Sequence, residues 1–570
     1  MKKNMLMVLA GLVAVAPLSS SSTKINGNEH SGADRKADAV YVNGNVYTVD
    51  SAFSRVSAIA VKGDRICWVG SDNEVLQNCK GEETKMIDLG GKTLIPGIIE
   101  SHLHYQMLGE MIERIDIYQK PKREILEKVR DEAKRLGPGK WIVSMGWNNE
   151  LWNESFPTRK ELDAVAPENP VVLSRVDGHS AWCNSLALQL AGINQETPNP
   201  QGGEILRKDD GSLWGMLIDT AMDMVMAVVT DDRSDERVRH LYSLADQSVI
   251  AYGITSLVDA GATCDDIRIL KKAYAAGALH VRAYEMLSEG EDTIYIRAGN
   301  KPEQDMFNGK LSVRAVKLYS DGSLGSRSAW LLENYSDREN HKGNGRWTDG
   351  EMYRIAGRVA GEGFQMATHA IGDAAVRQVV HVQKRVIDEL GIKDHRFRIE
   401  HFQIVNPEDI HYAISNGFIP SMQPAHATSD MNMAEDRLGK ERILTSYAWR
   451  TVLDKGGIIA GGSDAPVEAV NPFRSIYAAV SRKDMNGQPS GGWYPDEKMS
   501  REEALRSFTI WGAYAMFAEQ TRGSLEKGKY ADFVVIDRDI LSCDEDEIKD
   551  TKALATLIGG QVVYGNLNEP

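Results

Sequence analysis

The chain has 570 residues, of which 42% are hydrophobic and 26% are charged, and these proportions exclude a disordered tail or a low-complexity scaffold. Its net charge is −15 and it has no long basic run, which argues against nucleic-acid binding because a phosphate backbone requires a surface rich in Lys and Arg. The length accommodates one large α/β barrel with additional domains.

Residues 1–22 have the pattern of a secretory signal peptide. Lys2 and Lys3 precede an apolar stretch at residues 5–18, and a polar segment follows at 19–22. The apolar stretch is shorter than the roughly 18 residues that a membrane-spanning helix needs. The alternative, a short buried helix, accounts less well for the charged flank and the serine run. We therefore predict an exported protein, periplasmic or extracellular, whose mature form has no membrane anchor.

Both ends of the chain, residues 36–93 and 520–570, alternate short apolar runs with turns. Neither end has enough strands to bury a hydrophobic core by itself. We predict that the two ends together form one small β-sandwich.

Residues 94–519 alternate apolar strands with helical stretches, and this order predicts an α/β fold, a parallel (β/α)8 TIM barrel. One predicted helix begins after Asn406, which supplies an N-cap, and ends at Gly417, and another covers residues 373–390. The eight predicted strands are 94–100, 254–259, 281–286, 313–318, 364–369, 397–401, 418–423 and 457–464.

The first and second predicted strands are separated by far more residues than one helix needs. Residues of about 105–235 must therefore form an insertion, with its own strands near 141–145 and 171–175. The insertion leaves the barrel at the C-terminal ends of the strands, where barrel enzymes place their active sites. We predict that it forms a roof over the active site.

Six side chains near predicted strand ends indicate a metal centre. His102 and His104 follow the first strand, and at the strand period of two both imidazoles lie on the same side. Alone, this pair would be interpreted as packing or surface residues. Further candidates occur on later strands, at the ends where barrel enzymes gather catalytic groups, and these are Lys317, His369, His401 and Asp464.

The residue types suit hydrolysis assisted by a divalent metal ion. Imidazole and carboxylate are ligands of zinc, and bound zinc lowers the pKa of water toward about 7. Asp464 can accept the proton of that water and pass it to a leaving group. Lys317 can react with carbon dioxide to form a carbamate, an anion whose two oxygens bridge two metal ions. The alternative is a strand lysine that reaches solvent.

These motifs resemble those of the amidohydrolase superfamily, in particular its branch of amidohydrolase-3, YtcJ-like and N-substituted formamide deformylase-like proteins. The similarity is carried by residues 94–104, 316–327, 368–373, 399–401 and 462–467, and it extends over nearly the whole mature chain. The resemblance implies a centre of one or two metal ions in which His102, His104 and Asp464 hold one ion, His369 and His401 hold the other, and carboxylated Lys317 bridges them.

The resemblance also implies the reaction. Metal-bound hydroxide would attack the carbonyl of a small amide, N-acyl or N-formyl compound, and Asp464 would deliver a proton to the departing nitrogen. The same centre can instead act on a cyclic imide, a lactone or an ester, and this alternative stays open. A non-catalytic barrel that binds a ligand is a further alternative, although it has no need of all six side chains. Enzymes of this type often form homodimers.

Five more residues are predicted substrate contacts, and each has a structural alternative. Arg175 and His179 lie in the insertion, where the same residues can form a structural turn. Arg327 follows the lysine strand and either binds a substrate oxygen or pairs with an acid. Gln423 and His426 follow the seventh strand, and His426 can also be a histidine that only satisfies internal hydrogen bonds.

Overall fold

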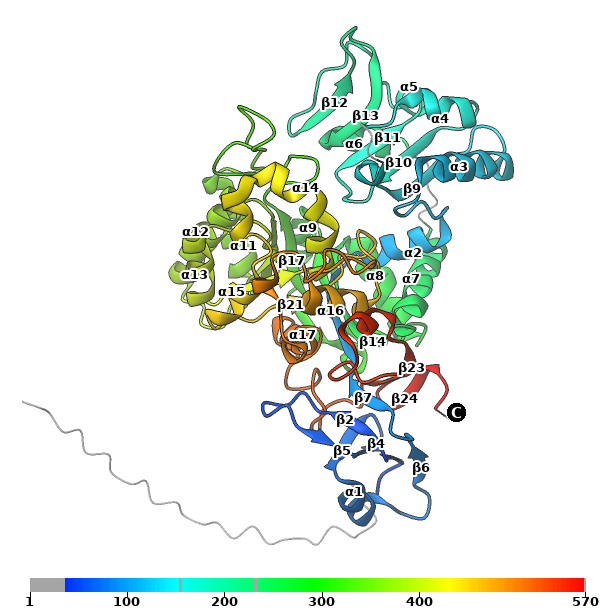
Figure 1. Cartoon of the computed structure of the whole chain (residues 1–570), viewed down its shortest axis with the longest axis vertical. Coiled ribbons are helices and arrows are strands. Elements are labelled where there is room, and N and C mark those ends of the chain that lie inside the picture. Colours follow the sequence, from blue (N-terminus) through cyan, green and yellow to red (C-terminus); the bar gives the residue numbers. More distant parts are fainter. Residues whose placement is uncertain (1–35, 153–155, 230–233, 568–570) are drawn as a thin grey trace, which may run out of the picture.

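The computed structural model describes residues 36–152, 156–229 and 234–567, so the predicted signal peptide lies outside the described residues. Three parts follow one another along the long axis of the molecule in Figure 1: a β-rich domain, a barrel and, beyond the barrel, the insertion. Within the described ranges, no helix has both the length and the apolar character of a membrane span.

Eight parallel strands form the barrel, and their spatial order follows the sequence. An isolated parallel bridge between Leu103 and Ala465 joins the two ends of the sheet. The predicted α/β fold with a (β/α)8 TIM barrel is thereby confirmed. The strands are β8 (Ile98–Leu103), β14 (Ile254–Ala262), β15 (Arg282–Leu287), β17 (Leu311–Tyr319), β18 (Gln365–Ala370), β19 (Arg398–His401), β20 (Ile419–Met422) and β21 (Ala460–Gly461).

Helices surround the barrel, and two of them have the predicted ends. Helix α12 (Asp373–Leu390) stops at Gly391, which has a left-handed backbone, and α13 (Pro407–Ser415) is capped by the side chain of Asn406. The remaining elements around the barrel are α7 (Asp235–Ile250), α8 (Cys264–Ala275), α9 (Glu291–Arg297), β16 (Glu303–Asp305), α10 (Met306–Gly309), α11 (Asp349–Gly361), α14 (Pro424–Arg442), η3 (Ile443–Thr445), α15 (Trp449–Asp454), α16 (Pro472–Ser481), η4 (Pro495–Glu497), α17 (Arg501–Ser507) and α18 (Ile510–Ala515).

The two-residue period of the strands decides which side chains point into the barrel. Ala315 on β17 and Ala367 on β18 belong to an apolar cluster, shared with β8, β14 and β15, that fills the interior next to Met516. Lys317 and His369 stand two positions further along the same strands and therefore also point inward. The apolar cluster occupies one end of the interior and leaves the C-terminal end to polar side chains.

The β-rich domain is a sandwich of two sheets drawn from both ends of the chain. Their spatial orders are β5-β4-β1-β6 and β24-β23-β22-β7-β2-β3. Tyr41, Phe533 and Leu557 are buried in the core that the two sheets share. The elements are β1 (Ala39–Val42), β2 (Asn45–Tyr47), β3 (Arg55–Val56), β4 (Ala58–Lys62), β5 (Arg65–Gly70), α1 (Asp72–Cys79), β6 (Lys85–Asp88), β7 (Thr93–Pro96), β22 (Phe533–Ile536), η5 (Glu545–Asp550), β23 (Ala553–Ile558) and β24 (Gln561–Gly565).

The predicted first barrel strand, residues 94–100, is divided between the two domains. β7 pairs with β2 and β22 in the sandwich, whereas β8 pairs with β14 in the barrel. The change of sheet occurs at Gly97, where a Cβ atom would lie 2.1 Å from Oγ1 of Thr255. Only glycine permits this close approach. Because residues 94–96 pair in the sandwich, the sequence prediction placed the start of the barrel too early.

A buried ion pair joins the sandwich to the barrel. Nε and Nη2 of Arg282 donate to the two carboxylate oxygens of Asp532 at 2.7 and 3.0 Å. The ring of Tyr530 lies 3.7 Å from the guanidinium carbon. A bidentate pair of this kind fixes orientation as well as distance.

The insertion has a five-stranded sheet of its own, with the spatial order β12-β13-β11-β10-β9. The strands predicted near 141–145 and 171–175 are β9 and β10. Trp147 and Trp182 are buried in one of its two apolar cores. The elements are α2 (Tyr105–Glu113), α3 (Lys122–Leu136), β9 (Ile142–Trp147), η2 (Asn149–Trp152), α4 (Arg159–Val165), β10 (Val171–Arg175), β11 (Ser180–Cys183), α5 (Ser185–Leu190), β12 (Gly203–Arg207), β13 (Leu213–Asp219) and α6 (Thr220–Met226).

Candidate metal centre

His102, His401 and Asp464 meet at the C-terminal end of the barrel although they are far apart in the sequence. One ligand atom of each lies within 4.8 Å of the others, so the three can hold one metal ion. Oδ1 of Asp464 lies 3.3 Å from Nε2 of His102 and 3.3 Å from Nε2 of His104. The four side chains therefore converge on one point.

Two main-chain hydrogen bonds hold this arrangement. The N–H of Asp464 donates to the carbonyl of His102 (N···O 2.7 Å), and the N–H of His104 donates to the carbonyl of Ala465 (N···O 2.8 Å). These bonds continue the parallel pairing beyond the ends of β8 and β21. Closure of the barrel itself therefore brings the two histidines to the aspartate.

A buried carboxylate orients the His102 ring. Nδ1 of His102 hydrogen-bonds to Oε2 of Glu400, and Nε of Arg398 donates to Oε1 of the same carboxylate at 2.7 Å. Nε2 of His102 therefore faces Asp464 and Lys317. A carboxylate on the other ring nitrogen typically orients a metal-binding histidine in this way. Burial and Lys317 lower the pKa of His102, but Glu400 and Asp464 raise it by more, so a metal ion competes with a proton here.

His401 and His369 are held by neighbours on the next strand or loop. Nδ1 of His401 hydrogen-bonds to Oε1 of Gln423 (2.9 Å), which leaves Nε2 for another ligand. Nε2 of His369 lies 3.2 Å from the carbonyl oxygen of Gly322. The two imidazole centroids are 4.5 Å apart.

Lys317 is buried among these groups, with 1% of its surface exposed. Its Nζ lies 3.5 Å from Nε2 of His102 and 4.7 Å from the ring centre of Tyr319. The amine therefore faces the candidate metal ligands, and the alternative of a strand lysine that reaches solvent is wrong.

The electrostatic surroundings favour metal-binding protonation states at three positions. Burial lowers the pKa of His369 well below its usual value, and Lys317 adds to this effect. Burial and the nearby His369 do the same for His401. These imidazoles are therefore neutral, the form that binds a metal ion. Burial raises the pKa of Asp464, but the neighbouring His102 and His104 outweigh it and hold the pKa well below its usual range.

Two of the candidate ligands have a left-handed backbone, with φ of +76° at His401 and +61° at Asp464. Such a conformation costs a non-glycine residue on the order of 1 kcal/mol or more and is concentrated at functional sites. On β19 the inward positions belong to Arg398 and Glu400, so strand alternation alone would point His401 outward. The positive φ turns His401 back toward the other ligands.

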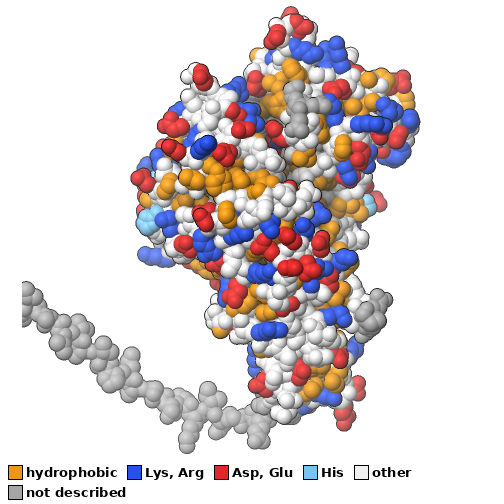
Figure 2. Space-filling view, viewed as in Figure 1, with side chains coloured by type: hydrophobic (Ala, Val, Ile, Leu, Met, Phe, Trp, Pro, Cys, Tyr) orange, Lys and Arg blue, Asp and Glu red, His pale blue; other side chains and the backbone are white. Residues whose placement is uncertain are grey.

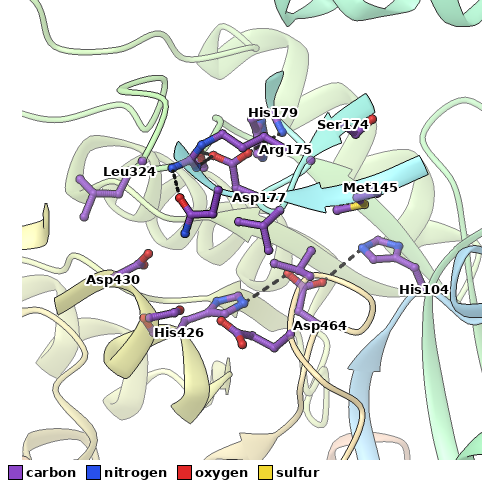
Figure 3. Close-up of a pocket in the computed structure, with 18 of the residues that line it drawn as sticks. His104, Met145, Ser174, Arg175, Asp177, His179, Leu324, His426, Asp430 and Asp464 are labelled. Carbon is purple, nitrogen blue, oxygen red and sulfur yellow. Dashed lines mark hydrogen bonds and ion pairs between the residues drawn. The ribbon is translucent and has the colours of Figure 1, made fainter. Parts of the chain in front are cut away.

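A cavity of about 680 Å³ opens over this cluster, a size that suits a small molecule. The insertion lines the opposite side, as the predicted roof requires, and Figure 3 shows Arg175 and His179 across the cavity from Asp464. Nδ1 of His179 hydrogen-bonds to Asp219 (2.7 Å), and its ring lies 6.0 Å from that of His369. Both predicted insertion residues therefore line the cavity.

The three remaining predicted substrate contacts have different positions. His426 lines the cavity, with Nε2 located 3.7 Å from Oδ2 of Asp464. Gln423 does not line the cavity and instead contacts the ring of His401. Arg327 also lies outside the cavity lining, where a backbone φ of +62° accompanies an ion pair with Asp337 (2.7 Å). The structural alternative, pairing with an acid, describes Arg327.

Sequence reasoning missed the groups that support the ligands. Glu400 lies in the motif of residues 399–401 and Arg398 directly precedes it; their period of two on a barrel strand was the available signal. Asp321 was also missed: its buried carboxylate accepts the backbone N–H groups of Ile371 (3.0 Å) and Gly372 (2.8 Å) and thereby joins the loops after β17 and β18. Burial raises the pKa of Asp321 to about 7.

Glu400→Gln is expected to weaken metal binding by about 10–100-fold, because the amide no longer provides the negative charge that orients His102 and increases its basicity. Isothermal titration of zinc into metal-free protein measures the change. Glu408→Gln, an exposed substitution at the start of α13, is the matched control. Unchanged zinc affinity in Glu400→Gln would show that the carboxylate has no part in orienting the ligand.

The donor set fits a divalent metal ion. Oδ1 of Asp464 is fully buried without a regular hydrogen bond, and the nitrogen donors of two histidines lie 3.3 Å away. Imidazole and carboxylate donors at a buried site are the ligands that zinc and similar ions prefer. Together, the barrel and the cluster at its C-terminal end form a candidate centre for a divalent metal ion.

Comparison with known proteins identifies the family. Residues 85–564 match the amidohydrolase family, Amidohydro_3. The chain is 30% identical over 537 residues to the YtcJ protein of Bacillus subtilis, covering 92% of this chain and 99% of that one. It is 28% identical over 546 residues to N-substituted formamide deformylase of Arthrobacter pascens, covering 92% and 98%.

A crystal structure of an uncharacterized metal-dependent hydrolase from Pyrococcus horikoshii superimposes with a TM-score of 0.73 and 25% identity, covering 89% of this chain and 99% of that one. The chain belongs to the amidohydrolase family and is a metal-dependent hydrolase.

Proposed function

We propose that this protein is an exported amidohydrolase that cleaves the C–N bond of a small amide, N-acyl or N-formyl compound. The observation that supports it most directly is the convergence of His102, His401 and Asp464, with Lys317 beside them, at a cavity of small-molecule size. A relative named for deformylating N-substituted formamides makes a formyl amide the first compound to test. The pattern of residues 1–22 supports export.

The proposed centre holds one or two divalent ions, with zinc as the favoured metal. His102, His104 and Asp464 would hold one ion, and His369 and His401 a second. When bound, such an ion lowers the pKa of water and polarises a carbonyl oxygen. Lys317, carboxylated by carbon dioxide, would bridge the two sites. This modification replaces a positive charge by a negative one and so removes repulsion between the buried amine and a cation.

The side chains around the cavity would have separate roles in the reaction. Asp464 is ionised and lines the cavity, so its carboxylate accepts a proton from the attacking water and returns it to the departing nitrogen. Glu400 holds the His102 ring that contacts this carboxylate. The insertion covers the site and limits the access of bulk water, which strengthens the electrostatic interactions inside.

The metal-loaded protein is expected to hydrolyse at least one simple amide from a set of N-formyl, N-acyl-amino-acid, dipeptide and cyclic-amide compounds. Release of the amine is measured, and chelation should abolish activity that zinc then restores. Esters and lactones are included because the same centre can attack them. Hydrolysis of esters with no turnover of any amide would contradict the proposed bond.

A further inference from the structure

We infer that the cavity selects uncharged amides that carry an aliphatic or aromatic group and that it discriminates against amides with a carboxylate group. This inference rests on the proposed function, since it names the substrate class of the same site. Two features of the cavity carry it: the apolar side chains of the wall and the pairing of the charges around them.

Several methionine and leucine side chains line the cavity. Met107, Leu151 and Met226 line the cavity and remain 40%, 50% and 41% exposed, which places large apolar surfaces at its mouth. Met145 and Met433 extend the apolar lining further. Thioether side chains are flexible and polarizable, so they adapt to aliphatic and aromatic groups alike. An apolar substituent that covers this surface contributes binding free energy.

Arg175 on β10 of the insertion lines the cavity, but its guanidinium group is already paired with Asp177. Nη1 donates to Asp177 at 2.7 Å, Nη2 to Asn148 at 3.0 Å and Nε to Asn149 at 3.1 Å. Burial raises the pKa of Asp177, but Arg175 and His179 outweigh it and lower the pKa, so the partner stays ionised. A substrate carboxylate would have to displace Asp177 in order to bind Arg175.

The second arginine of the lining is also paired. Nη2 of Arg114 lies 3.0 Å from Oε2 of Glu110, which lines the same cavity. On the outer face shown in Figure 2, acidic and basic side chains are intermingled. Both arginines of the lining already have acidic partners, and Lys317, which also lines the cavity, belongs to the proposed metal centre.

Two carboxylates of the lining face any incoming anion. Oδ2 of Asp430 accepts a hydrogen bond from the Tyr447 hydroxyl (2.7 Å), and Oε2 of Glu468 accepts one from the Tyr118 hydroxyl (3.0 Å). Burial raises the pKa of Asp430 to about 6, so this carboxylate is still ionised at neutral pH. A substrate carboxylate placed beside these two carboxylates would meet like charges, and an ammonium group would lose hydration against the methionine wall.

A matched set of formamides tests the inference. N-(3-methylbutyl)formamide is N-formyl-leucine without its carboxylate, N-formyl-leucinamide replaces the carboxylate by a neutral amide, and N-(3-aminopropyl)formamide carries an ammonium group. We expect kcat/KM for the methylbutyl compound to exceed that for N-formyl-leucine by at least about 100-fold, with the leucinamide closer to the neutral compound. Equal or higher kcat/KM for the anionic or the cationic compound would overturn the inference.

Variants of the wall separate apolar contact from general damage. Met107→Gln should lower kcat/KM for N-(3-methylbutyl)formamide about fivefold, mainly through KM, because a polar side chain replaces part of the apolar surface. Met107→Leu keeps an apolar side chain and should retain most of the wild-type kcat/KM for this compound. Met86→Gln, at an exposed position on the sandwich, is the control and should change nothing. An equal loss in the Gln and Leu variants would contradict the assigned apolar contact.

The set also distinguishes failure of the inference from failure of the proposed function. N-Methylformamide has no large substituent, so its hydrolysis tests the reaction alone. If no amide of any tested class is hydrolysed, the proposed function fails and binding decides the inference: a higher Tm with N-(3-methylbutyl)formamide but not with N-formyl-leucine supports it. Equal shifts, or a shift with the anion only, would refute it.

Discussion

Asp464→Asn is expected to lower turnover by about 10³-fold or more while the protein stays folded. The carboxylate is ionised and lies 3.3 Å from two imidazoles, so the amide variant loses a proton acceptor and a metal-binding oxygen at the same time. Steady-state kinetics on the best amide measures the effect, and circular dichroism and Tm report the fold. Full activity in this variant would falsify the assigned role.

A matched control keeps the interpretation of Asp464→Asn specific. Asp430→Asn alters another carboxylate of the same cavity, which interacts with Tyr447 instead of the candidate metal ligands. We expect its turnover to change far less than that of Asp464→Asn. Similar losses in both variants would indicate general damage to the cavity.

Lys317→Gln is expected to have the second largest effect. The variant removes the amine that would become the bridging carbamate, and zinc affinity should fall by more than the roughly 10–100-fold that follows changes in supporting groups. Zinc content and turnover are measured after dialysis against dilute zinc. Lys455→Gln, which alters an exposed lysine, should retain both.

Carbon-13 nuclear magnetic resonance tests the modification of Lys317 directly. Wild-type protein prepared with labelled bicarbonate should show a carbamate carbon that is missing from Lys317→Gln. A variant with normal zinc content and normal activity, or a wild-type protein without the labelled carbon, would contradict the proposed bridge.

The inward-facing ligands of the barrel were predictable from strand alternation. Lys317 and His369 occur two positions after small apolar residues on neighbouring strands, and such a period places all of them on one side of the sheet. The barrel itself was predictable because eight apolar strands alternate with helices. The ends of the helices at Asn406 and Gly391 were likewise available from the residue types that cap helices.

The orientation of other site residues was not available from the sequence. His401 faces the other candidate ligands only because its backbone φ is +76°, and no local sequence pattern predicts that conformation. Arg327 lies shortly after β17, the strand of Lys317, but the conformation of the loop places its side chain against Asp337 instead of in the cavity. Gln423 stands at a strand end, and only the register of β19 and β20 shows that it faces His401. These relations depend on three-dimensional contacts between segments that are distant in the chain.

The sandwich imposes an order of events on biosynthesis. β7 obtains one of its two neighbours from β22, and Arg282 obtains its carboxylate partner from Asp532, both of which leave the ribosome near the end of translation. The sheet that contains β7 therefore stays incomplete until β22 has been synthesised, and the sandwich domain can complete its folding only at the end of translation.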